Sequence, residues 1–231
     1  MAEVIKVIGK NAFVQVFEST RGMRVGDEAE FEGHMLEVTL GPGMLSRNYD
    51  GLQNDLDKME GVFLRRGEYT FPLDNDKLWD FKPLAKVGDK VAAGGWLGEV
   101  DENFQPHKIM VPFTFKGEYT VKSLKEAGQY TIGEVIAVLT DETGKDVEVT
   151  MIQRWPVKRA ITCYKEKPRP YKLLETGVRT IDTVNPIVEG GTGFIPGPFG
   201  TGKTVLQHAI SKQAEADIVI IAACGERANE V

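Results

Sequence analysis

Cysteine and histidine, the residues that build disulfide frameworks and zinc sites, are scarce in this sequence. It has two cysteines, Cys163 and Cys224, and three histidines that lie far apart. Two cysteines exclude a disulfide framework, and reduced thiols are the simpler interpretation. No apolar run reaches the roughly 20 residues that a membrane-spanning helix needs. Because no basic segment precedes an apolar one at the N-terminus, we also expect no signal peptide.

Basic residues are outnumbered by acidic ones, which argues against a nucleic-acid-binding surface. The 28 lysines and arginines face 34 aspartates and glutamates, so the net charge is −6. Nucleic-acid binding depends on basic surfaces, and we therefore predict no nucleic-acid partner. Hydrophobic residues make up 42% of the chain, which is enough for a core of normal size. The length allows one large domain or two small ones.

The first 40 residues have the pattern of a β-structure. Short apolar strands are expected at Val4–Ile8, Phe13–Phe17 and Met35–Leu40, with a turn at Gly9–Asn11 between the first two. This spacing predicts a small barrel or part of one. Asp50–Glu60 is compatible with one short helix.

Residues 66 to 155 continue the β pattern. Tight turns are expected around Val87–Val91 and Gly94–Val100, where glycines interrupt short apolar stretches. Further strands are expected at Lys108–Lys116, Tyr130–Leu139 and Asp146–Gln153.

The pattern changes after Arg159, where a charged, proline-broken segment at Lys165–Pro170 predicts a linker. Beyond Gly190 the sequence predicts a βαβ unit. A short strand is expected at Thr192–Ile195, and a helix follows, with apolar residues at helical spacing from Val205 onward. The continuous apolar run Ile218–Cys224 predicts a strand buried on both faces of a parallel sheet.

A glycine-rich loop lies between the first strand and the helix of that unit. It fits the phosphate-binding pattern of two glycines followed by lysine and a hydroxyl residue. Its residues are Gly197, Pro198, Phe199, Gly200, Thr201, Gly202, Lys203 and Thr204. Glycines let backbone N–H groups point into one concavity, and the helix start adds partial positive charge. Lys203 supplies an ammonium for β- and γ-phosphates, and Thr204 a hydroxyl ligand for Mg²⁺.

Glu226 and Arg227 follow the apolar run Ile218–Cys224 at its carboxyl end. Ligands of open α/β sheets bind at that edge, so the Glu226 carboxylate is a candidate to orient or deprotonate an attacking water. Arg227 is a candidate to contact phosphate or pair with an acid. On the pattern alone, the two residues fit a solvent-exposed turn better than a catalytic pair.

Several long motifs resemble the catalytic A subunit of V-type and archaeal A-type rotary ATPases. The motifs occur in the same order and cover nearly the whole chain. They are LGPGMLSRNYDGLQ from Leu40, FKPLAKVGDKVAAGGWLGEV from Phe81, HKIMVPF from His107, LLETGVRTIDTVNPIVEGG from Leu173, and GGTGFIPGPFGTGKTVLQHAISK from Gly190, with DIVIIAACGERANEV closing the chain. The long interval between Gly43 and Gly197 sets the chain apart from F-type β subunits and from flagellar and secretion ATPases.

The resemblance implies a mixed fold in three parts. Residues 1–53 would be the remainder of an N-terminal β-barrel, and 66–155 a β-rich bulge domain inserted in such subunits. Residues 156–231 would be a linker and the beginning of an α/β P-loop nucleotide-binding domain. The resemblance also implies that both ends of the family's chain are missing, and that the 231-residue chain alone would not turn over ATP.

The resemblance further implies a function in ATP hydrolysis or synthesis coupled to H⁺ or Na⁺ movement across a membrane. ATP or ADP and Mg²⁺ would be the cofactors. Nucleotide would bind at residues 197–205, which include Val205, with Mg²⁺ on Thr204 and with Lys203, Glu226 and Arg227 in catalysis.

The implied partners are the non-catalytic B subunit in an alternating hexamer, central and peripheral stalk subunits and, through these, a membrane-embedded ion-translocating sector. The subunit would lie on the cytoplasmic side of that membrane.

Four positions depart from the family pattern. Thr201 stands where relatives often have serine, alanine or cysteine, which precludes disulfide regulation there. Ala228 stands where glycine is usual, and Gly193-Phe194 replaces smaller residues.

Two alternatives without nucleotide chemistry remain open. Gly88–Val91 with the later Lys108 resembles biotinyl and lipoyl carrier domains, and we interpret this as a related architecture without the modification. The other alternative is a β-rich module that only docks on partners.

Overall fold

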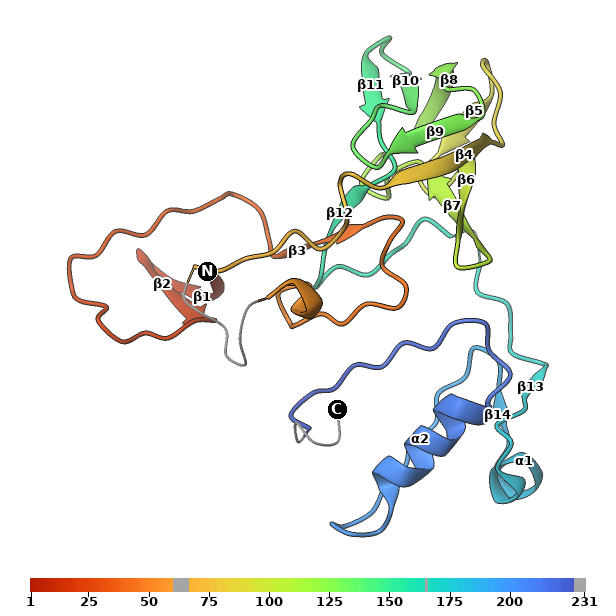
Figure 1. The fold of residues 1–231 in the computed structure, drawn as a ribbon. Coiled ribbons are helices and arrows are strands. Elements are labelled where there is room, and N and C mark those ends of the chain that lie inside the picture. Colours follow the sequence, from red (N-terminus) through yellow and green to blue (C-terminus); the bar gives the residue numbers. More distant parts are fainter. Residues whose placement is uncertain (60–66, 165, 227–231) are drawn as a thin grey trace. The chain divides into compact units, whose positions relative to one another are not determined.

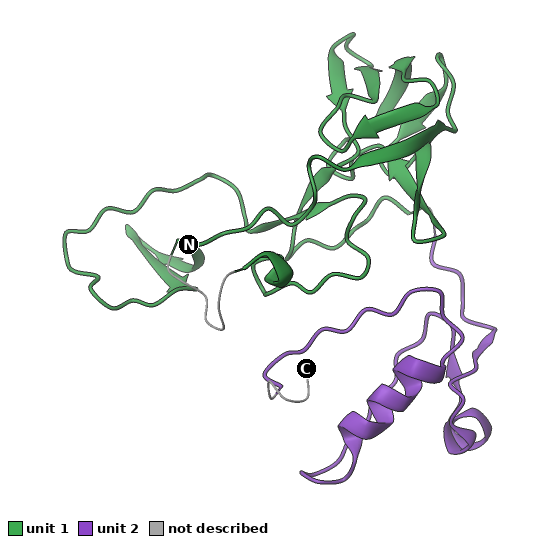
Figure 2. Cartoon of the chain, viewed as in Figure 1, with its two compact units in different colours: residues 1–164 green, residues 165–231 purple. Residues whose placement is uncertain are grey.

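The computed structural model describes residues 1–59, 67–164 and 166–226. The chain forms two compact units, residues 1–164 and 165–231 (Figure 2). The described regular structure of the first unit is β-strand apart from one 3₁₀ turn, and the described part of the second unit carries two α-helices (Figure 1). The predicted order of a β-rich part followed by a part with helices is therefore confirmed, and each unit is described by itself below.

The chain begins with an antiparallel hairpin of β1 (Ala2–Ile8) and β2 (Asn11–Val16), which confirms the two predicted strands and their turn. Gly9 takes a φ of +59° in that turn, a conformation that glycine adopts without steric cost. The hairpin is a separate two-stranded sheet, so the described residues contain no closed barrel. Apolar side chains such as Ile5 and Val7 remain more than half exposed on it.

A second two-stranded sheet joins distant parts of the first unit. In it β3 (Glu37–Leu40) pairs antiparallel with β12 (Gln153–Pro156), with Leu40 opposite Gln153. Trp155 on β12 is buried and packs edge-on against the Phe113 ring at 5.7 Å between centroids. We call this β3–β12 pair the stem, because the residues between its two strands form a structure of their own.

Two four-stranded antiparallel sheets make up that structure (Figure 1). One has the strand order β7-β6-β4-β9, and the other β11-β10-β8-β5. The strands are β4 (Leu78–Pro83), β5 (Lys90–Ala92), β6 (Trp96–Glu102), β7 (Gln105–Met110), β8 (Glu118–Leu124), β9 (Gly128–Thr131), β10 (Ala137–Asp141) and β11 (Asp146–Val149). All of these pairings are between antiparallel neighbours.

Three of the predicted strands are wrong in extent. The strand expected at Lys108–Lys116 ends at Met110. The expected strand Tyr130–Leu139 is two strands, because Glu134 folds the chain back by donating its N–H to the Thr131 carbonyl at 3.2 Å. The third expected strand, Asp146–Gln153, is also interrupted: β11 ends at Val149 and β12 begins at Gln153.

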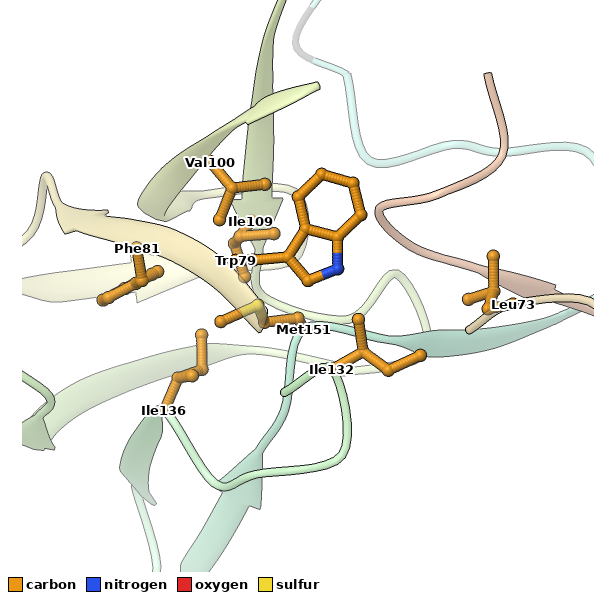
Figure 3. Close-up of a cluster of buried hydrophobic side chains, with 8 residues drawn as sticks. All are labelled: Leu73, Trp79, Phe81, Val100, Ile109, Ile132, Ile136 and Met151. Atoms are coloured by element: carbon orange, nitrogen blue, oxygen red, sulfur yellow. The ribbon is translucent and has the colours of Figure 1, made fainter. Parts of the chain in front are cut away.

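Buried apolar side chains form two clusters, and β6 contributes to both of them, through Val100 and Leu97. Alternate residues of β4, Trp79 and Phe81, are buried while their neighbours are exposed, as the two-residue period of a strand requires. They pack in a cluster that Figure 3 shows, with Leu73, Val100, Ile109, Ile132, Ile136 and Met151. A second cluster contains Leu97, Val111, Val121, Ala137, Leu139 and Val149. These clusters hold most of the buried apolar side chains in the described part of the chain.

We expect Gly98→Ala to destabilise this region, because Gly98 on β6 lies against the buried ring of Phe81. A Cβ at Gly98 would lie 2.2 Å from Phe81 Cε2 and 2.8 Å from the Lys82 carbonyl oxygen. Relief of this overlap needs backbone shifts, and overpacking of this kind costs about 3 kcal/mol. Urea unfolding of the chain measures the loss. Gly133→Ala is the matched control, because a Cβ there meets no atom within 4 Å, and an equal loss in both variants would contradict the packing argument.

The helix expected at Asp50–Glu60 is reduced to a single 3₁₀ turn, η1 (Leu56–Lys58). The physical reason is the side chain of Asp50, whose Oδ1 accepts hydrogen bonds from the N–H groups of Leu52 at 2.9 Å and Asn54 at 2.8 Å. An aspartate that captures nearby N–H groups favours a turn over a helix. Residues 60 and 66, where that helix ends and the predicted second domain begins, lie outside the described residues.

A buried carboxylate fastens the loop after β3 to the β6–β7 hairpin. Glu102 is 3% exposed, and its Oε1 accepts the N–H groups of Gly43 at 2.8 Å and Leu45 at 3.0 Å. Its Oε2 lies 2.8 Å from His107 Nδ1. Burial alone would raise the pKa of Glu102, but the hydrogen bonds from His107, Leu45 and Gly43 together lower it.

The lowered pKa of Glu102 predicts a stability that depends on pH. A carboxylate with a depressed folded-state pKa stabilises the fold above its unfolded pKa, near 4.5, and loses that contribution as pH falls through the lower folded value. At pH 7 we expect Glu102→Gln to cost about 2 kcal/mol, the scale of a charged hydrogen bond. The difference from the unchanged chain should shrink as the pH is lowered below 4.5. Urea unfolding across this range measures it, with Glu148→Gln as control, and a constant difference would refute the assignment.

Lys108 does not occupy the position of a carrier lysine. It lies within β7, where its Nζ pairs with Glu99 on β6 and sits 5.0 Å from the centre of the Trp96 ring. The tip of the β6–β7 hairpin is instead formed by Asn103 and Phe104, which take φ values of +54° and +67°. This geometry favours the interpretation of an unmodified domain.

Residues 166–226 of the second unit contain two short strands and two helices. The strands β13 (Leu173–Leu174) and β14 (Ile187–Val188) pair antiparallel, and α1 (Arg179–Val184) lies between them in the sequence. Helix α2 (Lys203–Gln213) is the helix that apolar spacing predicted.

The two strands predicted around α2 are wrong. Thr192–Ile195 and Ile218–Cys224 have no regular structure, and Ile218–Ile221 are 49–89% exposed. A parallel strand forms only when it hydrogen-bonds a neighbouring strand. No strand among the described residues pairs with either segment, so apolar composition alone does not make them strands.

Candidate phosphate-binding site

The loop before α2 has a backbone that only glycine adopts easily. Gly200 and Gly202 both take φ values of +80°, and Gly202 is the residue immediately before the helix. Gly197 matters for space, because a Cβ there would lie 2.5 Å from Thr201 Oγ1. The three glycines of the motif therefore permit a tight turn that other residues would open.

Two side chains of the loop donate hydrogen bonds to carbonyl groups of the same loop. The Thr201 hydroxyl donates to the Pro198 carbonyl at 2.8 Å, and Lys203 Nζ donates to the Gly197 carbonyl at 2.6 Å. Lys203 thus places its ammonium across the concave side of the loop, next to the first turn of α2. A cation at this position can meet an anion that the loop encloses.

The start of α2 supplies further donors. Gly202 caps the helix without any side-chain hydrogen bond, and the first intrahelical bond runs from the Leu206 N–H to the Gly202 carbonyl at 2.9 Å. The N–H groups of Lys203, Thr204 and Val205 precede that bond, as in every helix start. Together with the positive end of the helix dipole they favour an anion such as phosphate.

The remaining predicted residues of the loop take different positions. Thr204 is half-buried in the first turn of α2, whereas the side chains of Phe199 and Val205 are 84% and 73% exposed. Because Phe199 and Val205 bring apolar side chains, we expect their backbone N–H groups, not their side chains, to contact a phosphate. Pro198 contributes its carbonyl as the acceptor of the Thr201 bond.

In the described residues, neither a hydrogen bond nor an ion pair connects Glu226 to the loop. Glu226 is exposed in an irregular segment, and no hydrogen bond or ion pair within the described ranges joins it to Lys203 or Thr204. Its predicted position depended on the strand Ile218–Cys224, which does not form. Arg227 lies outside the described residues.

The residues that support α2 at its other end were not predicted. Thr176 is fully buried, and its N–H and hydroxyl both donate to Asp182 on α1. The next residue, Gly177, lies directly against Gln213 at the end of α2. The sequence does carry a signal for the bonds between Thr176 and Asp182, because threonine and aspartate side chains near a helix start commonly hydrogen-bond to nearby backbone N–H groups. Nothing local signals the contact with Gln213.

Mg²⁺ fits the chemistry of the loop. Thr204 offers one hydroxyl at the helix start, and Mg²⁺ takes oxygen ligands, keeps several waters and completes its shell with phosphate oxygens. Across residues 1–59, 67–164 and 166–226, no three His, Cys, Asp or Glu side chains gather in a way that could hold a metal ion. None of the helices in these ranges is long and apolar enough to cross a membrane.

Three family models match successive parts of the chain. Residues 1–33 match the β-barrel domain of the ATP synthase alpha/beta family, and 70–158 match the ATP synthase alpha/beta subunit barrel-sandwich domain. Residues 177–231, which contain the glycine loop, match the nucleotide-binding domain of the ATP synthase alpha/beta family.

Curated relatives are similar along the entire chain. The V-type ATP synthase alpha chain of Treponema denticola is 52% identical over 233 aligned residues, which cover all of this chain and 40% of that protein. The V-type ATP synthase alpha chain 1 of Treponema pallidum is 50% identical with the same coverage. The V-type ATP synthase alpha chain of Protochlamydia amoebophila is 48% identical, with 39% of that protein covered. The chain thus spans about two fifths of the length of these relatives.

Proposed function

Because the chain belongs to the ATP synthase alpha/beta family and resembles V-type alpha chains along its whole length, we propose that it carries the phosphate-binding part of a rotary ATPase catalytic subunit. The complete subunit would couple ATP hydrolysis or synthesis to the movement of H⁺ or Na⁺ across a membrane. The observation that carries the proposal is the loop itself: Gly197, Gly200 and Gly202 shape it, and Lys203 Nζ lies across it at the start of α2.

The proposed chemistry at the loop is electrostatic. Phosphoryl transfer depends on positioning and on stabilising negative charge on the phosphate oxygens. The backbone N–H groups at the start of α2 would hold the β- and α-phosphates of ATP or ADP. Lys203 would exchange the Gly197 carbonyl for a phosphate oxygen, which gives its ammonium an ionised acceptor. Mg²⁺ held by Thr204 would neutralise charge on the phosphates.

Glu226 is proposed to act on the attacking water, and Arg227 to contact phosphate or an acid. A carboxylate orients or deprotonates water when it lies within hydrogen-bonding reach of that water. Support for Glu226 comes from its position in the segment that matches the nucleotide-binding domain of the family. The assignment requires residues 218–226 to approach the loop more closely in the working enzyme than in the present structure.

The proposed partners are those of a rotary ATPase. They are non-catalytic B subunits alternating with this subunit in a hexamer, central and peripheral stalk subunits and, through the stalks, a membrane-embedded sector. The subunit is proposed to be peripheral, on the cytoplasmic side of that membrane. Support comes from the similarity to V-type ATP synthase alpha chains.

Calorimetric titration tests whether the loop binds phosphates. Mg-ATP, Mg-ADP and adenosine are titrated into the assembled complex that contains the full-length subunit. A phosphate-binding loop predicts that both nucleotides bind and that adenosine, which has no phosphate, does not compete with them. Failure of both nucleotides to bind would overturn the proposal and favour a module that only docks on partners.

A further inference from the structure

In the described part of the second unit one residue is buried, and it lies well before the phosphate loop in the sequence. Among the described residues from 166 to 226, Thr176 alone is buried, at 0% exposure. Every other described residue there is at least partly exposed. A buried threonine needs hydrogen-bond partners for its hydroxyl and its N–H, so its surroundings are specified more closely than those of its neighbours.

Asp182 provides those partners. Its Oδ1 accepts the Thr176 N–H at 3.0 Å and the Thr176 hydroxyl at 2.6 Å, and its Oδ2 accepts the Gly177 N–H at 3.1 Å. The Thr176 hydroxyl also accepts the Val178 N–H at 3.2 Å. These bonds fix residues 176–178 as a turn on the start of α1. Hydrogen bonds from the Thr176 hydroxyl and from the backbone hold the pKa of Asp182 below its usual range, so the carboxylate stays charged at neutral pH.

The turn at residues 176–178 contacts the carboxyl end of α2. Gly177 takes a φ of +73°, and a Cβ there would lie 2.8 Å from Gln213 Oε1 and 2.9 Å from Gln213 Cβ. Just beyond the helix, the Glu215 N–H donates to the Glu175 carbonyl at 3.1 Å. Close packing and a backbone hydrogen bond thus join residues 175–177 to the carboxyl end of α2.

The other end of α2 is the phosphate loop. The helix has 11 residues from Lys203 to Gln213, a length of about 16 Å at 1.5 Å per residue. A hydrogen-bonded helix moves as a rigid rod over such a length, so a shift at Gln213 is transmitted to Gly202 and Lys203. Displacement of a positioning group by about 1 Å can reduce a rate about a hundredfold.

We propose that Asp182 is a positioning residue for the phosphate loop, acting through the Thr176–Gly177 turn and the Gln213 end of α2. It touches no nucleotide, and its role is to fix the direction and axial position of the helix that carries Lys203. The inference rests on the proposed function, because it concerns the position of the helix that follows the same loop.

The test measures Mg-ATP hydrolysis by assembled ATPases whose full-length subunit carries Thr176→Val, Thr176→Ser or Asp182→Ala. Valine keeps the shape of threonine but leaves Asp182 Oδ1 without its hydroxyl donor, whereas serine keeps that donor. The control is Thr183→Ala on the same helix, because the Thr183 hydroxyl only donates to the Arg179 carbonyl within α1, at 2.7 Å. All rates are expressed per assembled enzyme, so that a loss of folded protein is not counted as a loss of rate.

We expect Thr176→Ser and Thr183→Ala to stay within about twofold of the unchanged kcat/KM. Thr176→Val should lower it about tenfold and Asp182→Ala about a hundredfold, with kcat falling and KM for Mg-ATP rising. If Thr176→Val and Asp182→Ala lower only the yield or the melting temperature, with kcat and KM unchanged per enzyme, the turn is merely structural and the proposal is wrong. Should Asp182→Ala fail to assemble, the valine and serine pair decides alone.

Lys203→Ala in the same assay separates the two proposals. If Lys203→Ala is inactive while Thr176→Val is normal, the loop binds phosphate but is not positioned through the turn. If Lys203→Ala hydrolyses Mg-ATP at the unchanged rate, the proposed function itself fails.

Discussion

Replacing Lys203 with alanine in the full-length subunit is expected to reduce ATP turnover by the assembled enzyme about a thousandfold or more. The substitution removes the cation that lies across the loop while leaving the glycine backbone in place. Charge stabilisation is the main contribution to phosphoryl transfer, and a single ionic donor at the phosphates carries several kcal/mol of it. Steady-state phosphate release from Mg-ATP measures the effect.

The matched control for Lys203→Ala is Lys212→Ala, which removes the same charge from the last turn of the same helix. Lys212 lies at the end of α2 away from the loop, so we expect turnover near that of the unchanged enzyme. Melting of the two variants should also be similar, because Lys203 is exposed and its loop contributes little packing. Near-normal turnover in Lys203→Ala would show that the loop does not serve phosphate chemistry.

Replacing Glu226 with glutamine should separate binding from hydrolysis. Glutamine keeps the size of the side chain but cannot accept a proton from water, and general-base catalysis contributes about 10²–10⁴ in rate. We therefore expect Mg-ATP to bind with nearly unchanged affinity while hydrolysis falls by that factor. Binding is measured by titration and hydrolysis by single-turnover kinetics on the same preparation.

Asp217→Asn is the control for Glu226→Gln, because it neutralises another exposed acid of the segment after α2. We expect it to leave both measurements unchanged. Parallel losses of binding and hydrolysis in Glu226→Gln would instead mean that Glu226 holds the site together, and the proposed role on water would be wrong.

The phosphate loop could be predicted from sequence because its determinants are local. Glycines at Gly200 and Gly202, a lysine at the helix start and apolar spacing through α2 all lie within a few residues of one another. Short-range constraints of this kind fix φ values and helix starts whatever the rest of the chain does. The hairpin of β1 and β2 was predictable for the same reason.

The errors arose where structure depends on distant neighbours. The apolar run Ile218–Cys224 has the composition of a buried parallel strand, but strand formation requires a paired neighbour, and in the described residues it has none. Gly177 and Gln213 are in contact although they lie 36 positions apart, and no periodic pattern in the sequence indicates such a contact. Turns within long apolar stretches, such as the one at Thr131–Glu134, were hidden because Ile132 and Ile136 are buried like strand residues.

The stem has a consequence for how such a protein can evolve. Because β3 pairs with β12, Leu40 and Gln153 lie opposite each other, and the chain enters and leaves the two four-stranded sheets at one point. A coding segment inserted at that point adds a whole domain without redirecting the chain on either side, since neighbouring ends make domain insertion tolerable. Residues 41–152 are therefore the natural segment for a gene to gain, lose or exchange in one step, and the natural cassette to graft between related subunits.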